Sequence, residues 1–331
     1  MAHLLTPIQI GPARVRNRIA MPPMVRLSPH VAPELLDNDG EVTQPIIDYY
    51  RARAEAGTGL VIVEATAVDP AGRVWRQGLN AYDPSHTDGL AALARAIAET
   101  GATPGIQLVH GGPQADPSLF GGVAVGPSPV PPSVSELEPR ELDMPTLLRI
   151  QGRFVEAGAM AADAGFRFIE AHGAHGYLLD SFVSTTRNHR ADAFGGSIEN
   201  RMRMMVDVIV RMKARIGDRA AVGCRISAFN HIAEGFGPSD LSTMVRCLED
   251  AGSDFVDLSI DRALRESFGS GRTSGQLAKA VTRLPVLIAG GLKTPEDAEQ
   301  AVSAGHGDVA CIGRGMLTDA AWSAKAIAAL L

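Results

Sequence analysis

The sequence has few cysteines, no block of basic residues and no long apolar run. Its three cysteines, Cys224, Cys247 and Cys311, lie far apart in a chain of 331 residues. They therefore show neither the pairing pattern of a disulfide-rich protein nor the spacing of a metal or iron–sulfur site. This usage is typical of the reducing cytosol, and we expect a cytoplasmic protein.

The charged residues are nearly balanced, with 31 Lys and Arg against 37 Asp and Glu and a formal net charge of −6. Basic and aromatic residues are not interleaved, so we expect no nucleic-acid partner. The amino-terminal segment lacks an apolar core, and no stretch of about 18 apolar residues occurs, so neither export nor membrane insertion is indicated. The mean hydropathy of +0.05 is ordinary for a soluble enzyme.

Short apolar runs alternate with segments of helical periodicity eight times along the chain. Eight such pairs predict a closed (β/α)8 TIM barrel, an α/β fold. A doubly wound sheet is the competing fold, but it carries a glycine-rich turn after its first strand, where this chain has Pro22-Pro23-Met24. The expected strands are Arg18–Pro22, Leu60–Ala65, Gly105–Val109, Phe166–His172, Ala221–Ile226, Phe255–Ser259, Val286–Ala289 and Val309–Ile312.

Three further features complete the predicted barrel. Ile8-Gln9-Ile10 and Val15-Arg16-Asn17 flank Gly11-Pro12 and predict a small hairpin that closes the barrel floor. Two connections, 110–144 and 173–196, are far longer than the usual two to six or so residues and should lie at the catalytic face. The first could instead be a proline-rich surface excursion. No repeat or linker divides the chain, so we expect one domain over residues 1–331.

The segment HGAHGYLL, from His172 to Leu179, follows one of the expected strands. If that strand belongs to a barrel, two imidazole donors and a phenol converge in the active-site mouth. Such a group polarises a carbonyl and places a proton donor beside it. The residues alone leave a second interpretation open, in which His172 and His175 cap a glycine-rich loop and Tyr177 packs as an ordinary ring.

Glycine-rich turns follow the last two expected strands, at Gly290-Gly291 and at Gly313-Arg314-Gly315. In barrels, loops at these positions commonly bind phosphate, because glycine lets backbone N–H groups approach the anion. An isolated pair of glycines is more often a helix cap, but glycines at both turns point to a phosphorylated ligand, with Arg314 as counter-charge.

Two polar residues interrupt strands that are otherwise apolar. Gln107 lies within GIQLVH and Arg225 within GCRIS. A buried arginine needs a partner. Arg225 could pair with a core carboxylate, either Glu64 or Asp257, or it could hold negative charge on a bound heterocycle.

Taken together, these residues resemble the Old Yellow Enzyme family of NAD(P)H:flavin oxidoreductases, over almost the whole chain. The resemblance rests on LLTPIQIGPARVRNRIAMPPMVR, DYYRARAEAGTGLVIVEATAV, GIQLVHGG, PVLIAGG and DVACIGRG, and above all on AGFRFIEAHGAHGYLLDSFVSTTRNHRADAFGGSIENRMR. It implies a noncovalent FMN at the barrel mouth, reduced by NADPH or NADH and reoxidised by an activated alkene. The implied substrates are enones, enals and enoyl thioesters, reduced by a ping-pong mechanism.

The resemblance also implies a role for each candidate residue. His172 and His175 would donate to the substrate carbonyl oxygen, and Tyr177 would protonate the α-carbon. The implied FMN-binding residues are Pro23, Met24, Val25 and Ala65 beside the flavin, Gln107 at its pyrimidine edge, Arg225 at the N(1)–C(2) carbonyl, and Gly290, Gly291, Gly313 and Arg314 at the phosphate.

The sequence departs from the family in three places. Val25 stands where relatives often have a hydrogen-bonding threonine or cysteine, and Ser184-Thr185-Thr186 replaces a familiar serine-proline. The chain has no cysteine cluster, so we expect the single-domain form without the iron–sulfur extension of larger relatives, with electrons that come directly from a nicotinamide or from a separate protein. Two alternatives stay open: a phosphate-binding isomerase or lyase on the same barrel, and a flavin-binding subunit without turnover. The sequence leaves open whether the protein forms a homo-oligomer.

Overall fold

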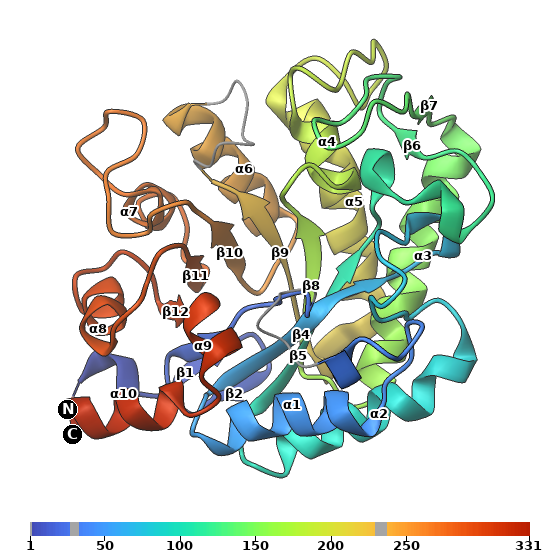
Figure 1. Cartoon of the computed structure of the whole chain (residues 1–331). Coiled ribbons are helices and arrows are strands. Elements are labelled where there is room, and N and C mark those ends of the chain that lie inside the picture. Colours follow the sequence, from blue (N-terminus) through green and yellow to red (C-terminus); the bar gives the residue numbers. More distant parts are fainter. Residues whose placement is uncertain (1, 27–32, 229–236) are drawn as a thin grey trace.

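Eight parallel strands form a closed barrel in the computed structural model, which describes residues 2–26, 33–228 and 237–331 (Figure 1). Their order around the barrel is β10-β11-β12-β3-β4-β5-β8-β9, which is their order along the chain. The predicted TIM barrel is confirmed, and closure excludes the doubly wound sheet. The strands are β3 (Ile19–Met21), β4 (Leu60–Ala67), β5 (Thr103–Val109), β8 (Phe168–Gly173), β9 (Ala221–Ser227), β10 (Val256–Ser259), β11 (Val286–Ala289) and β12 (Val309–Cys311).

Helices follow the strands and surround the barrel (Figure 1). Several begin at a side-chain cap, such as Thr294, which accepts a hydrogen bond from the backbone of Asp297. In the described residues no helix is long and apolar enough to cross a membrane. The helices are α1 (Gln44–Glu55), α2 (Thr87–Ala98), α3 (Met144–Asp163), α4 (Leu178–Val183), α5 (Ile198–Ile216), α6 (Pro238–Asp250), α7 (Ser274–Lys279), α8 (Pro295–Ser303), α9 (Arg314–Thr318) and α10 (Trp322–Leu330).

The predicted amino-terminal hairpin is present as β1 (Ile8–Ile10) and β2 (Ala13–Val15), which pair antiparallel. Its apolar residues pack into the same cluster as the lower interior of the barrel, so it closes the floor as expected. The second strand starts earlier than predicted. Asn17 is excluded from it because its amide donates to the Gly57 carbonyl at 2.8 Å and accepts from the Ile19 N–H at 3.1 Å, which turns the chain into β3.

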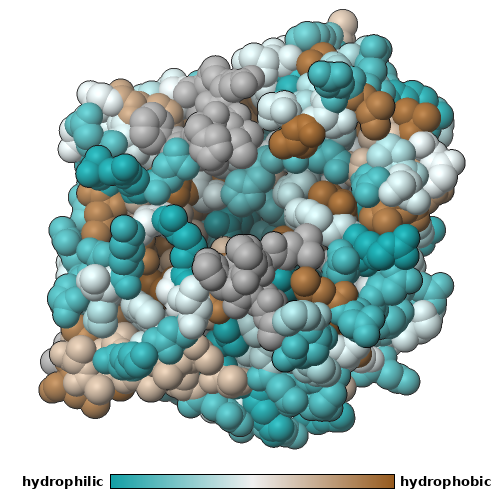
Figure 2. Space-filling view, in the orientation of Figure 1, coloured by the Kyte–Doolittle hydropathy of each residue, from teal (hydrophilic) through white to brown (hydrophobic). Residues whose placement is uncertain are grey.

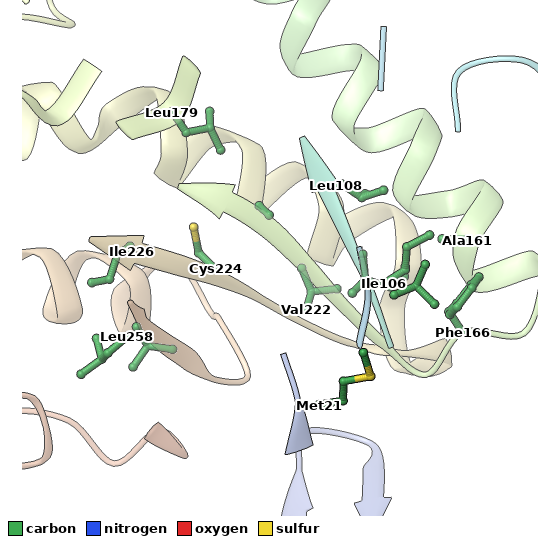
Figure 3. Close-up of a cluster of buried hydrophobic side chains, with 14 of the residues drawn as sticks. Met21, Ile106, Leu108, Ala161, Phe166, Leu179, Val222, Cys224, Ile226 and Leu258 are labelled. Atoms are coloured by element: carbon green, nitrogen blue, oxygen red, sulfur yellow. The ribbon is translucent and has the colours of Figure 1, made fainter. Parts of the chain in front are cut away.

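The apolar core has two layers, inside the barrel and between barrel and helices. Inside, the rings of Phe168 and Phe255 stack with centroids 3.9 Å apart. Outside, side chains of β5 and β9 meet the helices, and Figure 3 shows Ile106 of β5 close to Ala161 of α3. Since alternate residues of a strand face opposite sides, the inner side of each strand remains available for polar residues near the mouth.

The two long connections contain secondary structure of their own. The connection from His110 to α3 carries two short strands, β6 (Val125–Gly126) and β7 (Arg140–Glu141), which pair with each other. The connection after β8 carries α4. The α4 backbone is anchored beside β5 by a hydrogen bond from Leu178 N–H to the His110 carbonyl at 3.1 Å, so both connections lie at the carboxyl end of the strands.

Gly223 of β9 is predicted to be essential for packing inside the barrel. A Cβ there would lie 2.5 Å from the Phe255 carbonyl oxygen and 2.8 Å from its ring. We expect Gly223→Ala to lower the free energy of unfolding by about 1–3 kcal/mol through overpacking. Urea denaturation measures the effect.

Gly152→Ala in α3 is the matched control, because a Cβ at Gly152 meets only an Arg211 nitrogen at 4.0 Å. Alanine is favoured over glycine in a helix, so this variant should be neutral or more stable by about 0.5–1 kcal/mol. Equal stability of the two variants would show that the interior tolerates a side chain at Gly223.

Candidate functional site

A cavity of about 690 Å³ opens beside the carboxyl ends of the strands. The space-filling view shows the molecule hollowed near its centre, with hydrophilic residues inside the hollow (Figure 2). The ends of β3, β9, β10, β11 and β12 all contribute to its wall. Six of the predicted cofactor-binding residues line it: Met24, Arg225, Gly290, Gly291, Gly313 and Arg314.

The glycines of this wall differ in how far packing and backbone conformation require them. A Cβ at Gly290 would lie 2.0 Å from the Ile260 carbonyl oxygen, and a Cβ at Gly313 would lie 3.1 Å from the Met24 sulfur. Gly291 has φ +68°, a conformation that favours glycine. Bare backbone and the exposed guanidinium of Arg314 therefore border one end of the cavity, as an anion-binding site requires. A phosphorylated cofactor fits these residues.

Arg225 pairs with a core carboxylate and also lines the cavity. Its Nη1 lies 3.5 Å from Oδ2 of Asp257, one of the two carboxylates expected as partners. The other, Glu64, is occupied by Arg26, whose Nε donates to it at 2.7 Å. Arg225 nevertheless lines the cavity, and its buried Nε has no partner in the described residues. A buried donor without a partner is costly, so a ligand acceptor suits this position.

Gln107 lies on the inner side of β5, where its Nε2 donates to Oε1 of Glu170 at 2.7 Å. Both residues are buried. Since one amide N–H is engaged by a carboxyl group, the side chain is oriented so that the carbonyl oxygen of Gln107 can accept a hydrogen bond from a ligand.

His172 lies at the end of β8 and is almost fully buried. Burial, with smaller contributions from His175 and Arg225, lowers the pKa of His172 well below its usual value, so the ring is neutral. Its Nδ1 accepts a hydrogen bond from the Ala174 N–H at 3.3 Å. The single ring proton is therefore on Nε2, which makes this nitrogen a donor.

His175 is held by contacts with β9 and β10. Its backbone is left-handed, with φ 62°, and its N–H donates to the Ser227 hydroxyl at 3.2 Å. Its Nε2 lies 2.7 Å from the Ser259 hydroxyl. When that hydroxyl donates, the ring proton of His175 is on Nδ1. The two histidine rings meet edge to face, with centroids 5.1 Å apart.

Tyr177 precedes α4 and completes the cluster, with its ring centroid 4.9 Å from that of His172. It packs against Trp75 at 6.0 Å and belongs to a small apolar cluster with Ala65, on which Val25 also packs. Burial raises the pKa of Tyr177 to about 12. The phenol therefore stays protonated across the ordinary pH range.

The loop that carries these residues is fixed by Asp180 of α4. Its carboxylate accepts from the Gly176 N–H at 2.7 Å and from the Ser227 hydroxyl at 3.0 Å. Burial raises the pKa of Asp180 to about 6. The carboxylate is thus ionised near neutral pH and holds the loop on β9.

The structure thus divides the predicted residues into three groups. Six line the cavity, five form a cluster made of Tyr177, His172, His175, Val25 and Ala65, and Gln107 lies inside the barrel. Pro23 is buried and is found neither in the cavity wall nor in the Tyr177 cluster.

Sequence reasoning missed several residues of the site. Ser227 and Ser259 are strand-end residues, and a polar residue at the carboxyl end of a barrel strand was a usable signal. Glu170 interrupts a strand as Gln107 and Arg225 do, and this signal could have found it. Trp75 lies on a connection without a motif, and nothing in the sequence indicated it.

Comparison with known proteins shows similarity over nearly the whole chain. The sequence profile described as "NADH:flavin oxidoreductase / NADH oxidase family" matches residues 3–330. An NADPH dehydrogenase of Bacillus licheniformis is 33% identical over 96% of this chain and 92% of its own length. An NADH oxidase of Thermoanaerobacter brockii is 36% identical over 98% of this chain, which spans only 50% of that relative's length.

Among solved structures, the Old Yellow Enzyme homologue from Zymomonas mobilis matches with a TM-score of 0.81 and 26% sequence identity. The match covers 95% of this chain and 89% of that protein. The two proteins therefore share the closed-barrel fold.

Proposed function

The chain belongs to the NADH:flavin oxidoreductase / NADH oxidase family, and on that premise we propose that it reduces the activated C=C bond of α,β-unsaturated carbonyl compounds. Members of this family are NAD(P)H-dependent flavin oxidoreductases of the Old Yellow Enzyme type, with FMN as cofactor. FMN, when bound, supplies the hydride transfer. The observation that carries the proposal is the cluster of two histidines and a protonated tyrosine near the cavity at the carboxyl ends of the strands.

The cavity residues would hold the cofactor. Backbone groups at Gly290, Gly291 and Gly313, with Arg314, suit the phosphate. The Gln107 carbonyl oxygen suits the N–H of a pyrimidine edge, and the guanidinium of Arg225 suits a carbonyl that gains negative charge. Met24, Pro23, Val25 and Ala65 would form the apolar surroundings of the ring.

His172 and His175 would bind and polarise the substrate carbonyl. His172 is neutral with its proton on Nε2, so it donates without carrying charge. The ring of His175 is oriented by Ser259, and when the Ser259 hydroxyl donates to Nε2, the Nδ1–H of His175 is its donor. Two oriented donors stabilise an oxyanion more than a neutral carbonyl, and this difference lowers the barrier.

Tyr177 would give the proton to the α-carbon. Its pKa of about 12 keeps it protonated, and a buried site excludes competing water. Trp75 packs against its ring and limits its movement. The two half-reactions, with NAD(P)H and then with the alkene, would use one site in turn, which is the ping-pong scheme.

Family membership disfavours the isomerase or lyase alternative. The non-turnover alternative is separated from ene-reduction by anaerobic titration. The purified protein should show a flavin spectrum that NADPH or NADH bleaches and that an enone restores. Bleaching that no enone, enal or enoyl thioester reverses would contradict the proposed substrate class.

Tyr177→Phe should slow the enone-dependent half-reaction by about a hundred- to ten-thousand-fold, because a positioned acid is lost. The nicotinamide-dependent half-reaction should stay nearly unchanged, since it requires no proton from the phenol. Stopped-flow absorbance measures the two separately. Equal slowing of both, or of neither, is incompatible with the assigned role.

Replacing His172 and His175 together by alanine should weaken binding of phenols by roughly tenfold to a hundredfold, the value of two hydrogen-bond donors. A phenolate oxygen mimics the enolate, so the loss should grow with the acidity of the phenol. Charge-transfer absorbance of the flavin-loaded proteins gives the affinities. If the folded double mutant binds phenols with unchanged affinity, the two histidines do not contact the phenol oxygen.

Val25→Thr should raise the reduction potential of the bound flavin, because a hydroxyl near O(4) can stabilise the electron-rich ring, whereas valine cannot donate. Reduction by nicotinamide should become faster and enone reduction slower. Val25→Ala is the control that removes packing without adding a donor. Redox titration decides, and a potential that is unchanged or lower in the threonine variant means that Val25 only packs against its neighbours.

A further inference from the structure

Four polar residues fill the layer of the barrel interior next to the cavity. They are Gln107 of β5, Glu170 of β8, Arg225 of β9 and Asp257 of β10, and all are buried. The strand registers bring them together, since Gln107 is opposite Glu170 and Arg225 is opposite Asp257. Barrel interiors are usually filled by bulky apolar side chains, so a polar layer here requires a reason.

Glu170 and Asp257 interact with each other although one strand separates them. Their side chains are within hydrogen-bonding reach, and each carboxyl acts on the other. The residue opposite Glu170 on the intervening strand β9 is Gly223, which presents no side chain. The glycine that admits the ring of Phe255 therefore also leaves the two carboxyl groups in contact.

These four residues have more buried acceptor oxygens than donors to satisfy them. Glu170 Oε1 accepts from Gln107 at 2.7 Å, but Glu170 Oε2 and both oxygens of Asp257 are buried without a hydrogen-bond partner in the described residues. Arg225 approaches Asp257 only as an ion pair at 3.5 Å. Two carboxylates in contact repel strongly at a buried site. A single proton between them converts the repulsion into a hydrogen bond and satisfies two of the three oxygens.

We propose that Glu170 is a neutral carboxylic acid in the folded protein, that its Oε2–H donates to Asp257, and that through this proton it is a positioning residue for Gln107 and Arg225. The part that concerns FMN rests on the proposed roles of those two residues.

The electrostatics assign the proton to Glu170. Burial and the charge of Asp257 raise the pKa of Glu170 well above its usual value. Burial also raises the pKa of Asp257, but Arg225 opposes that shift more directly. Apart from Arg225, the Cys224 and Cys311 thiols near the pair are neutral, because burial raises their pKa values. His172 is likewise uncharged.

The shared proton has two consequences for the cofactor-facing atoms. Glu170 can accept from the Gln107 amide while it donates to Asp257, which keeps the Gln107 carbonyl oxygen available as an acceptor. Arg225 is then opposed by a single carboxylate. If Glu170 were ionised, two carboxylates would face one guanidinium, and the layer would repel negative charge on a reduced ring.

The experiment compares infrared spectra of the FMN-loaded protein and its Glu170→Gln variant at about pH 8. A protonated carboxylic acid has a C=O band separate from that of a carboxylate. The wild-type protein should show this band, and Glu170→Gln should lack it. Asp180→Asn is the control, because Asp180 is equally buried but has a pKa of about 6 and is ionised at that pH. This variant should keep the band.

A second measurement uses glutamine as a mimic of the neutral acid. Its amide can accept from Gln107 and donate to Asp257, so Glu170→Gln should keep the FMN affinity and the reduction potential of the wild type within error. Glu170→Ala removes both hydrogen bonds and should weaken FMN binding about tenfold.

A wild-type spectrum without the band would overturn the proposal. So would a higher potential in Glu170→Gln, because that rise is the mark of a negative charge removed. Weakening of FMN binding in Glu170→Gln that equals that in Glu170→Ala would also overturn it. None of these results depends on enone turnover, so failure of the proposed substrate class leaves the inference unaffected.

Discussion

The parallel register across β8, β9 and β10 is the constraint on which the site depends. It sets His172 opposite Arg225 and Arg225 opposite Asp257. Because the strands close into a barrel, this register cannot shift without also moving the stacked rings of Phe168 and Phe255 on β8 and next to β10. The packing of these two rings thus helps to fix the strand register that places His172, Arg225 and Asp257.

The loop after β8 orients the hydrogen-bond donors of the site relative to these strands. His175 adopts a left-handed backbone, and Asp180 and Ser227 hold the loop against β9. The left-handed backbone of His175 is unfavourable by itself, and the hydrogen bonds to Ser227 and Asp180 stabilise it. As a result, His172, His175 and Tyr177 are oriented by contacts that involve three different elements.

Burial determines the protonation states throughout this region. It keeps His172 neutral and raises the pKa of Tyr177 to about 12. The charged groups are Arg225, which pairs with Asp257, and Asp180 near neutral pH. In the proposed function, the guanidinium of Arg225 would stabilise a ring that becomes anionic, and the uncharged side chains of His172 and Tyr177 would receive an uncharged carbonyl compound.

Much of this could be read from the sequence. Eight alternations of apolar and helical segments determined the barrel, because periodicity is local, and HGAHGY and the paired glycines lay at its strand ends. What the sequence left undecided were contacts between distant strands. It offered Glu64 and Asp257 equally as partners of Arg225, and only the closed barrel assigned Glu64 to Arg26. The tertiary structure likewise brought Ser259 to His175 and Glu170 to Asp257. Such pairings depend on register and closure, which no local pattern encodes.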